Sequence, residues 1–148
     1  MASHQDNTKL IAPCGLYCGS CTILKARGNS ALTEKLAQAL NIPAEQVNCL
    51  GCREQKGHIP IMGEPMCPTY QCCIEQKSLE FCYQCQEFPC LKLAPAADKA
   101  QVLPHNSKVY NLVLLQKLGV EKWLQKAGGL LNQYLKGKKS RGGDELEI

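Results

Sequence analysis

The clearest helical pattern of hydrophobic residues lies in SALTEKLAQAL, over residues 30–40. Four apolar residues recur there at helical spacing and share one face: Leu32, Leu36, Ala39 and Leu40. Ser30 is suited to cap the start of this helix, which must end before Pro43. Shorter helices are predicted for TILKAR, stopped at Gly28 and Asn29, and for PAEQV, which begins at Pro43.

The C-terminal third of the chain has a second apolar pattern. An apolar stripe runs through KVYNLVLLQKL, which Asn106 or Ser107 can cap: Val109, Leu112, Val113 and Leu115 or Gln116. Gly119 predicts the end of this helix, and the next helix, VEKWLQKA, should end at Gly128 and Gly129, before a third, LLNQYLK. We expect a helical cap on the preceding part, because the second and third helices lack the polar cluster of a DNA-reading helix.

The middle of the chain has no comparable pattern. Residues 49–68 are rich in glycine and proline, which predicts loops held together by something other than a long helix or strand. One more helix is predicted over residues 72–80, with Ile74 and Leu79 facing inward. Aromatic residues make up only 5% of the chain, so a large aromatic core is not expected either.

Charge and the N-terminal residues limit the classes of function. The net charge is +4, and the densest basic run, KGKKSR, lies in the C-terminal tail, so nucleic-acid binding is disfavoured. The uncharged stretch over residues 10–24 is interrupted by Pro13, Gly15 and Gly19 and cannot span a membrane. We expect a cytoplasmic protein with reduced thiols; a protein partner is possible, and the sequence does not identify it.

Cysteine is the most informative residue type. The chain has eleven cysteines, all between Cys14 and Cys90, in motifs whose two-residue gaps let neighbouring sulfurs face one ion. The first set with the spacing of a four-thiolate zinc site is Cys49, Cys52, Cys67 and Cys72, with fourteen residues between its two halves. A second set can be drawn from Cys18, Cys21, Cys82 and Cys85, with Cys14 and Cys90 as substitutes or spares. The spacing leaves this partition open, and Cys73 is interpreted as a small buried hydrophobe.

Iron–sulfur binding is the main alternative to zinc. The spacing Cys14-x3-Cys18-x2-Cys21 occurs in enzymes that hold a four-iron cluster, and one of Cys82, Cys85 or Cys90 could complete such a site. Ser20 stands where those enzymes usually have an aromatic residue, and the chain is too short for their barrel. Zinc is therefore favoured, with about two ions expected. No catalytic residue is predicted, because His58 is interpreted as a loop residue or a substitute metal ligand and His105 as the start of a helix; an enzyme is not expected.

Three cysteine segments together resemble a known family. IAPCGLYCGSC, CLGC and FCYQCQEFPC agree in order and in flanking residues with small cysteine-rich bacterial and archaeal proteins catalogued as domain of unknown function 3795 (DUF3795). The resemblance covers roughly residues 9–93 and implies metal binding, with no activity to transfer. It implies ten shared ligands: Cys14, Cys18, Cys21, Cys49, Cys52, Cys67, Cys72, Cys82, Cys85 and Cys90.

The predicted organisation is a small α-rich irregular fold, whose cysteine-rich loops and knuckles are organised by metal and followed by a helical C-terminal part. Its segments are a disordered N-terminus (1–9), a cysteine-rich metal-binding body (10–94), a helical part of the same domain (95–136) and a flexible tail (137–148). The predicted function is structural metal binding, with zinc first and iron–sulfur or nucleic-acid binding as alternatives.

Overall fold

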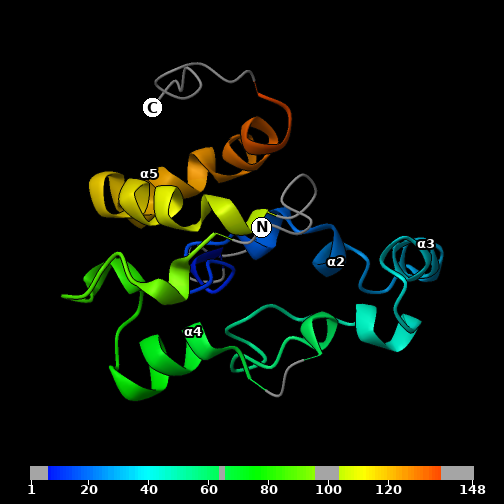
Figure 1. Ribbon diagram of the computed structural model, residues 1–148. Coiled ribbons are helices and arrows are strands. Elements are labelled where there is room, and N and C mark those ends of the chain that lie inside the picture. Colours follow the sequence, from blue (N-terminus) through cyan, green and yellow to red (C-terminus); the bar gives the residue numbers. More distant parts are fainter. Residues whose placement is uncertain (1–6, 64–65, 96–103, 138–148) are drawn as a thin grey trace.

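The computed structural model describes residues 7–63, 66–95 and 104–137 (Figure 1). Across these ranges the chain is mostly helical, and its only strand-like pairing is a single bridge between Ile11 and Tyr17. The α-helices are α2 (Thr22–Lys25), α3 (Ser30–Leu40), α4 (Pro68–Tyr70) and α5 (Lys108–Lys136). A π-helical turn, η4 (Gln71–Gln76), continues α4, and the 3₁₀ turns are η1 (Cys18–Ser20), η2 (Ala44–Val47), η3 (Pro60–Met62), η5 (Cys82–Gln84), η6 (Leu91–Leu93) and η7 (Pro104–Ser107). The α-rich fold is confirmed; organisation of the loops by metal stays a prediction.

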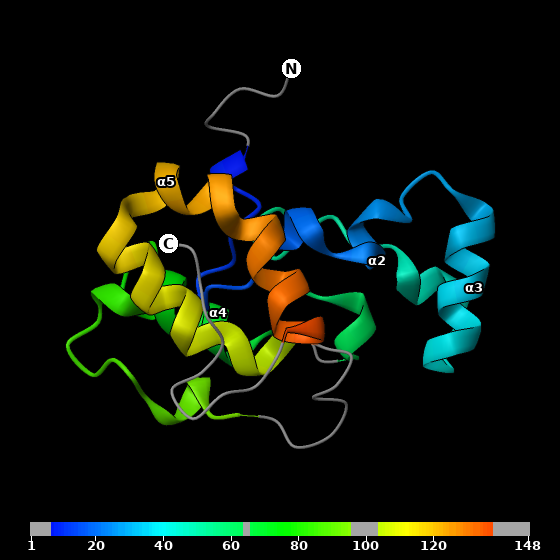
Figure 2. The same ribbon diagram turned by 90° about the horizontal axis from the view of Figure 1, so that it is seen from above.

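Helix α5 bends once instead of breaking twice. Gly119 has a left-handed φ of 76° inside it, so the predicted break there is confirmed, and Figure 2 shows the bend from above. The predicted end at Gly128 and Gly129 is wrong, because the helix continues to Lys136. The side chains of Trp123 and Ala127, in the turns before these glycines, are buried. Their packing offsets the roughly 1 kcal/mol that each glycine costs inside a helix.

Helix α5 covers the cysteine-bearing loops (Figure 1). Its side chains Leu112, Leu115 and Trp123 are fully buried, and the Trp123 ring meets Tyr17 edge-on, with 5.7 Å between ring centroids. Asn111 is buried as well, and its Nδ2 donates to the Gly15 carbonyl oxygen at 2.9 Å. The predicted cap on the cysteine-rich body is therefore present in the described residues.

Helices α2 and α3 form a small second core with η2, on the side of the molecule where Figure 2 labels α3. All three predicted helices are confirmed, with two corrections to α3. Its N-cap is Asn29 and not Ser30, because the Asn29 side chain accepts from the Leu32 amide at 3.1 Å. Its buried residue is Ala37, whereas Ala39 is exposed.

The helix predicted over residues 72–80 lies earlier in the chain. It begins at Pro68, which occupies the first helical position, and it ends at Gln76. Proline is favoured at that position because its missing amide would have no helical partner. The shift changes where Cys72 lies, as described below.

The predicted terminal segments fall largely outside the described residues. Of the predicted N-terminal segment, residues 7–9 are described, and they form a turn in which the Leu10 amide donates to the Asn7 carbonyl oxygen. Of the tail, only Gly137 is described. Among the described helices, none combines the length and apolar character needed to cross a bilayer.

Candidate functional site

The thiols of three loops influence one another electrostatically and form what we call the central thiol group: Cys14, Cys18, Cys21, Cys49, Cys52 and Cys67. Backbone hydrogen bonds bring these loops together. The Gly57 amide donates to the Cys52 carbonyl at 2.9 Å, and the Gly57 carbonyl accepts from the Cys67 amide at 2.8 Å. Gly57 needs to be glycine, because its φ is +81° and an added Cβ would lie 2.8 Å from the Tyr70 ring. These two hydrogen bonds of Gly57 thus link the backbone at Cys67 to the backbone at Cys52.

Cys52 is at the centre of this group. Burial raises the pKa of the Cys52 thiol well above its usual range, and negative charge on Cys14, Cys18 or Cys67 raises it further. Such an influence decays with distance, so these four sulfurs lie near one another. Burial likewise raises the pKa of Cys18 to about 11, and that of Cys49 also rises.

Backbone amides point at several of these sulfurs. The Gly51 amide donates to Cys49 Sγ at 3.4 Å, and the Cys52 amide hydrogen-bonds the Cys18 sulfur. The Leu16 amide does the same for Cys14. Each bond lowers the pKa of its thiol, because it stabilises the thiolate form. The loops therefore offer partial compensation for thiolate charge, which suits sulfurs that coordinate a cation.

Arg53 holds the cysteine-bearing segments together, and no pattern in the sequence indicated this role. Its Nε donates to the Ile11 carbonyl and its Nη2 to the Glu80 carbonyl, each at 2.7 Å. The guanidinium carbon also lies 5.0 Å from the centre of the Phe81 ring. One side chain thus joins the segments that carry Cys14, Cys52 and Cys82.

The remaining thiols line a separate cavity of about 760 Å³. We call them the pocket thiols: Cys72, Cys73, Cys82, Cys85 and Cys90. Cys82 begins η5 and Cys85 follows it, and the Gln84 side chain accepts from the amides of Glu80 and Phe81 at 2.9 Å. The Cys82 amide donates to the Pro13 carbonyl at 2.9 Å, so this cavity adjoins the central group.

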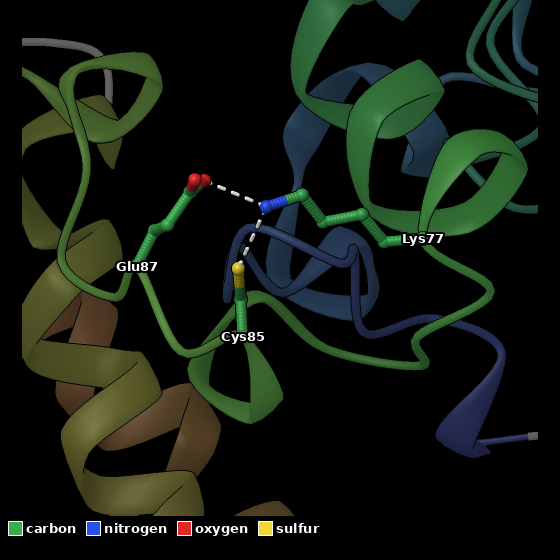
Figure 3. Close-up of polar contacts among 3 residues, drawn as sticks. All are labelled: Lys77, Cys85 and Glu87. Atoms are coloured by element: carbon green, nitrogen blue, oxygen red, sulfur yellow. Dashed lines mark hydrogen bonds and ion pairs between the residues drawn. The ribbon is translucent and has the colours of Figure 1, made fainter.

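Lys77 lies beside Cys85 and Glu87 in this cavity (Figure 3). Its Nζ is 2.6 Å from Glu87 Oε2 and 3.1 Å from Cys85 Sγ. The bond to Glu87, and then the bond to Cys85, raises the pKa of Lys77 above its usual range, while Lys77 lowers the pKa of Glu87. Lys77 therefore stays positively charged next to a thiol.

The ten predicted ligands are grouped differently from the pairing that the spacing suggested. Cys72 was drawn with Cys49, Cys52 and Cys67, but it lies on the pocket wall because the helix that begins at Pro68 carries it there. Cys18 and Cys21 were drawn with Cys82 and Cys85. Negative charge on Cys14 or Cys49 instead raises the pKa of Cys18, and negative charge on Cys21 raises that of Cys49. The thiols whose charge raises the pKa of Cys82 are Cys73, Cys14 and Cys90.

The structure also describes Cys73, His58 and His105, which were not among the ten predicted ligands. Cys73 is buried, as predicted, but it hydrogen-bonds Cys82, which lowers the pKa of Cys73 and raises that of Cys82. His58 is exposed on its loop, and His105 lies in η7 at the start of α5, as expected.

A converged metal-ligand geometry is absent from the described residues. Within residues 7–63, 66–95 and 104–137, no three histidine, cysteine, aspartate or glutamate side chains are placed so that they could hold one ion together. The thiols are all free. Their loops bring them near one another, but the sulfurs would have to turn toward a common point to coordinate metal.

The fold and these thiols define a small, mostly helical, cysteine-rich protein. The chain belongs to the family described as "Protein of unknown function (DUF3795)", whose model matches residues 10–95. The resemblance drawn from the cysteine motifs is thereby confirmed. No curated protein and no solved structure matches the chain.

Proposed function

We propose that the protein binds metal ions through thiolates and that the central thiol group holds a structural zinc ion. The observation that carries this proposal is the electrostatic influence on Cys52 of three thiols from two other loops, Cys14, Cys18 and Cys67. Four thiolates are the ligand set of a closed structural zinc site. Cys21 and Cys49 lie beside this set and are the alternative ligands.

The electrostatics of the group favour a cation. Burial raises the pKa of Cys14, Cys18 and Cys52, so without a cation these thiols stay protonated near neutral pH. Lys108 favours the thiolate of Cys14 and Arg53 that of Cys52, but each is secondary to the effect of burial. A divalent ion would displace the protons and compensate the thiolate charge. The Leu16 and Cys52 amides would also stabilise the thiolates of Cys14 and Cys18.

The loops explain why such an ion would be structural. Residues 49–63 contain only one 3₁₀ turn, η3, and few of their side chains are buried. Thiolate–zinc binding supplies apparent free energies of about 10–16 kcal/mol in small zinc domains, and that free energy is folding free energy. Zinc at Cys52 and Cys67 would hold the two ends of this segment in place.

Metal analysis of protein purified without oxygen tests the proposal. We expect zinc in the wild-type protein, loss of one ion per chain in Cys52→Ser, and no loss in Cys73→Ala, which removes a buried thiol outside the central group. Equal zinc content in all three proteins would assign the metal elsewhere.

Iron–sulfur binding is the second candidate. The thiols of CGLYCGSC lie together, since negative charge on Cys14 and Cys21 raises the pKa of Cys18. Three thiolates of one loop could hold a cluster with one iron left for another ligand. An absorption spectrum separates the two candidates, because a cluster is brown and contains sulfide, whereas zinc thiolate has no visible colour.

A further inference from the structure

We infer that Lys77 and Cys85 form a reversible covalent cross-link on oxidation, an N–O–S bridge in which one oxygen atom joins the lysine nitrogen to the cysteine sulfur. The bridge would make the wall of the cavity lined by the pocket thiols a site of modification by dioxygen. The inference rests on the contact between these two side chains and does not require metal in the central thiol group.

The two reacting atoms already lie close together. Lys77 Nζ is 3.1 Å from Cys85 Sγ (Figure 3). This is shorter than the 3.4 Å between the Gly51 amide nitrogen and Cys49 Sγ. An oxygen atom bonded to both would draw the nitrogen and the sulfur only slightly closer. Groups held at such a separation react with little loss of motional freedom, which favours the intramolecular product.

The backbone on both sides of this pair is fixed by hydrogen bonds. Lys77 follows the π-helical turn η4, and its amide donates to the Cys72 carbonyl oxygen at 3.1 Å. Cys85 follows η5, and its amide donates to the Cys82 carbonyl oxygen at 3.1 Å. Phe81, between the two turns, is fully buried. Lys77 and Cys85 therefore both extend from folded turns of one anchored segment.

The surroundings of the pair supply access and a proton acceptor. The Lys77 side chain is 33% exposed and that of Glu87 74%, and Cys85 is partly exposed on the cavity wall. Glu87 Oε2 lies 2.6 Å from Lys77 Nζ. The ammonium group must lose a proton before its nitrogen can form a new bond, and Glu87 is placed to accept that proton. The ion pair that neutralises Lys77 thus also positions its proton acceptor.

Dioxygen is the oxidant in this reaction. The S–H bond of Cys85 and two N–H bonds of the Lys77 ammonium group break, and one S–O bond and one O–N bond form. Sulfur and nitrogen each give up two electrons, and dioxygen takes all four. One of its oxygen atoms enters the bridge and the other leaves as water with two of the released hydrogens, while the third hydrogen leaves as a proton through Glu87. The sulfur is then at the oxidation level of a sulfenic acid, which thiols can reduce.

The bridge would change the charge of the cavity wall. It removes one thiol and the positive charge of Lys77, and it leaves the Glu87 carboxylate without its ion-pair partner. The reduced protein has a neutral ion pair at this place, whereas the oxidised protein has a net negative charge there. The cavity therefore differs between the two redox states in both charge and thiol number.

Mass spectrometry of the full-length protein tests the bridge. Protein purified without oxygen and freed of reductant is exposed to air, alkylated and digested with trypsin. Because a bridged Lys77 is no longer a trypsin site, we expect an uncut peptide over residues 57–92 that has gained one oxygen atom and lost two hydrogen atoms. Excess dithiothreitol should remove this product, and dioxygen labelled with heavy oxygen should place the label in the bridge.

Matched variants assign the product to this pair. Lys77→Arg keeps a positive charge beside Glu87 but has no reactive amine, and Cys85→Ser has no thiol, so neither should form the product. Lys92→Arg, which changes another lysine of the cavity wall, should form it at the wild-type rate. Cleavage after Lys77 as in the reduced protein, with Cys85 unchanged, in a disulfide or oxidised to a sulfinic acid, would overturn the inference. Absence of zinc from the protein would bear on the proposed function alone.

Discussion

Arg53 is the side chain whose replacement most directly tests how the cysteine segments are held together. In Arg53→Ala, the buried Ile11 carbonyl loses its donor, which should cost about 1–3 kcal/mol. Loss of the contact with the Phe81 ring should add about 0.5–1 kcal/mol. The bond to the Glu80 carbonyl is exposed, so water replaces it and its loss should add no more than about 0.5 kcal/mol.

The expected total is a decrease of about 1.5–4.5 kcal/mol in the free energy of unfolding. Urea denaturation at a fixed metal content measures it, with the exposed Arg27→Ala as the control for removing an arginine. Arg53→Lys should recover only part of the loss, because an ammonium group lacks the fork that reaches two carbonyls. If Arg53→Ala and Arg27→Ala differed by less than about 0.5 kcal/mol, the assigned role of Arg53 would be incorrect.

Three further predictions follow from other contacts. Gly15→Ala should reduce stability by about 2–4 kcal/mol in urea denaturation, because φ is +88° and the new Cβ would lie 3.0 Å from Leu112 Cγ and the Lys108 oxygen. Gly28 has a similar φ but open space around it, so Gly28→Ala should lose clearly less stability. Equal losses in the two variants would contradict the packing argument. Trp123→Ala should cost about 3–5 kcal/mol in the same assay, since the ring is fully buried against Tyr17, whereas the exposed Tyr110→Ala should change little. Zinc binding near neutral pH should release at least about three protons per ion, because burial holds the pKa of Cys18 at about 11 and keeps the free thiols protonated; affinity should therefore fall as pH falls. Calorimetry in two buffers of different ionisation enthalpy counts the protons, and release of fewer than one would show that the thiols are not the ligands.

Local signals in the sequence predicted the helices well, but they did not predict how the thiols are arranged. The apolar spacing in residues 30–40 and the glycine at 119 each act within one element, so α3 and the bend in α5 could be predicted. Pro68 is also a local signal, and its preference for the first helical position would have predicted the start of α4. The helix end predicted at Gly128 and Gly129 was wrong, because burial of Trp123 and Ala127 outweighs the poor helix propensity of the two glycines.

The grouping of the thiols depends on contacts between distant segments. Spacing placed pairs of sulfurs on single turns, but it could not show that Arg53 joins Ile11 to Glu80 or that Gly57 ties Cys52 to Cys67. Cys73 illustrates the same limit, since the sequence indicated its burial and not its hydrogen bond to Cys82. These contacts decide which loops meet, and each joins residues too far apart in the chain for periodicity to reveal.

The most direct test of the central claim is the metal content per chain of the protein purified without oxygen, measured together with its absorption spectrum. We expect about two zinc ions per chain and no visible colour. Protein that is folded, free of metal and retains all eleven thiols in reduced form would contradict it.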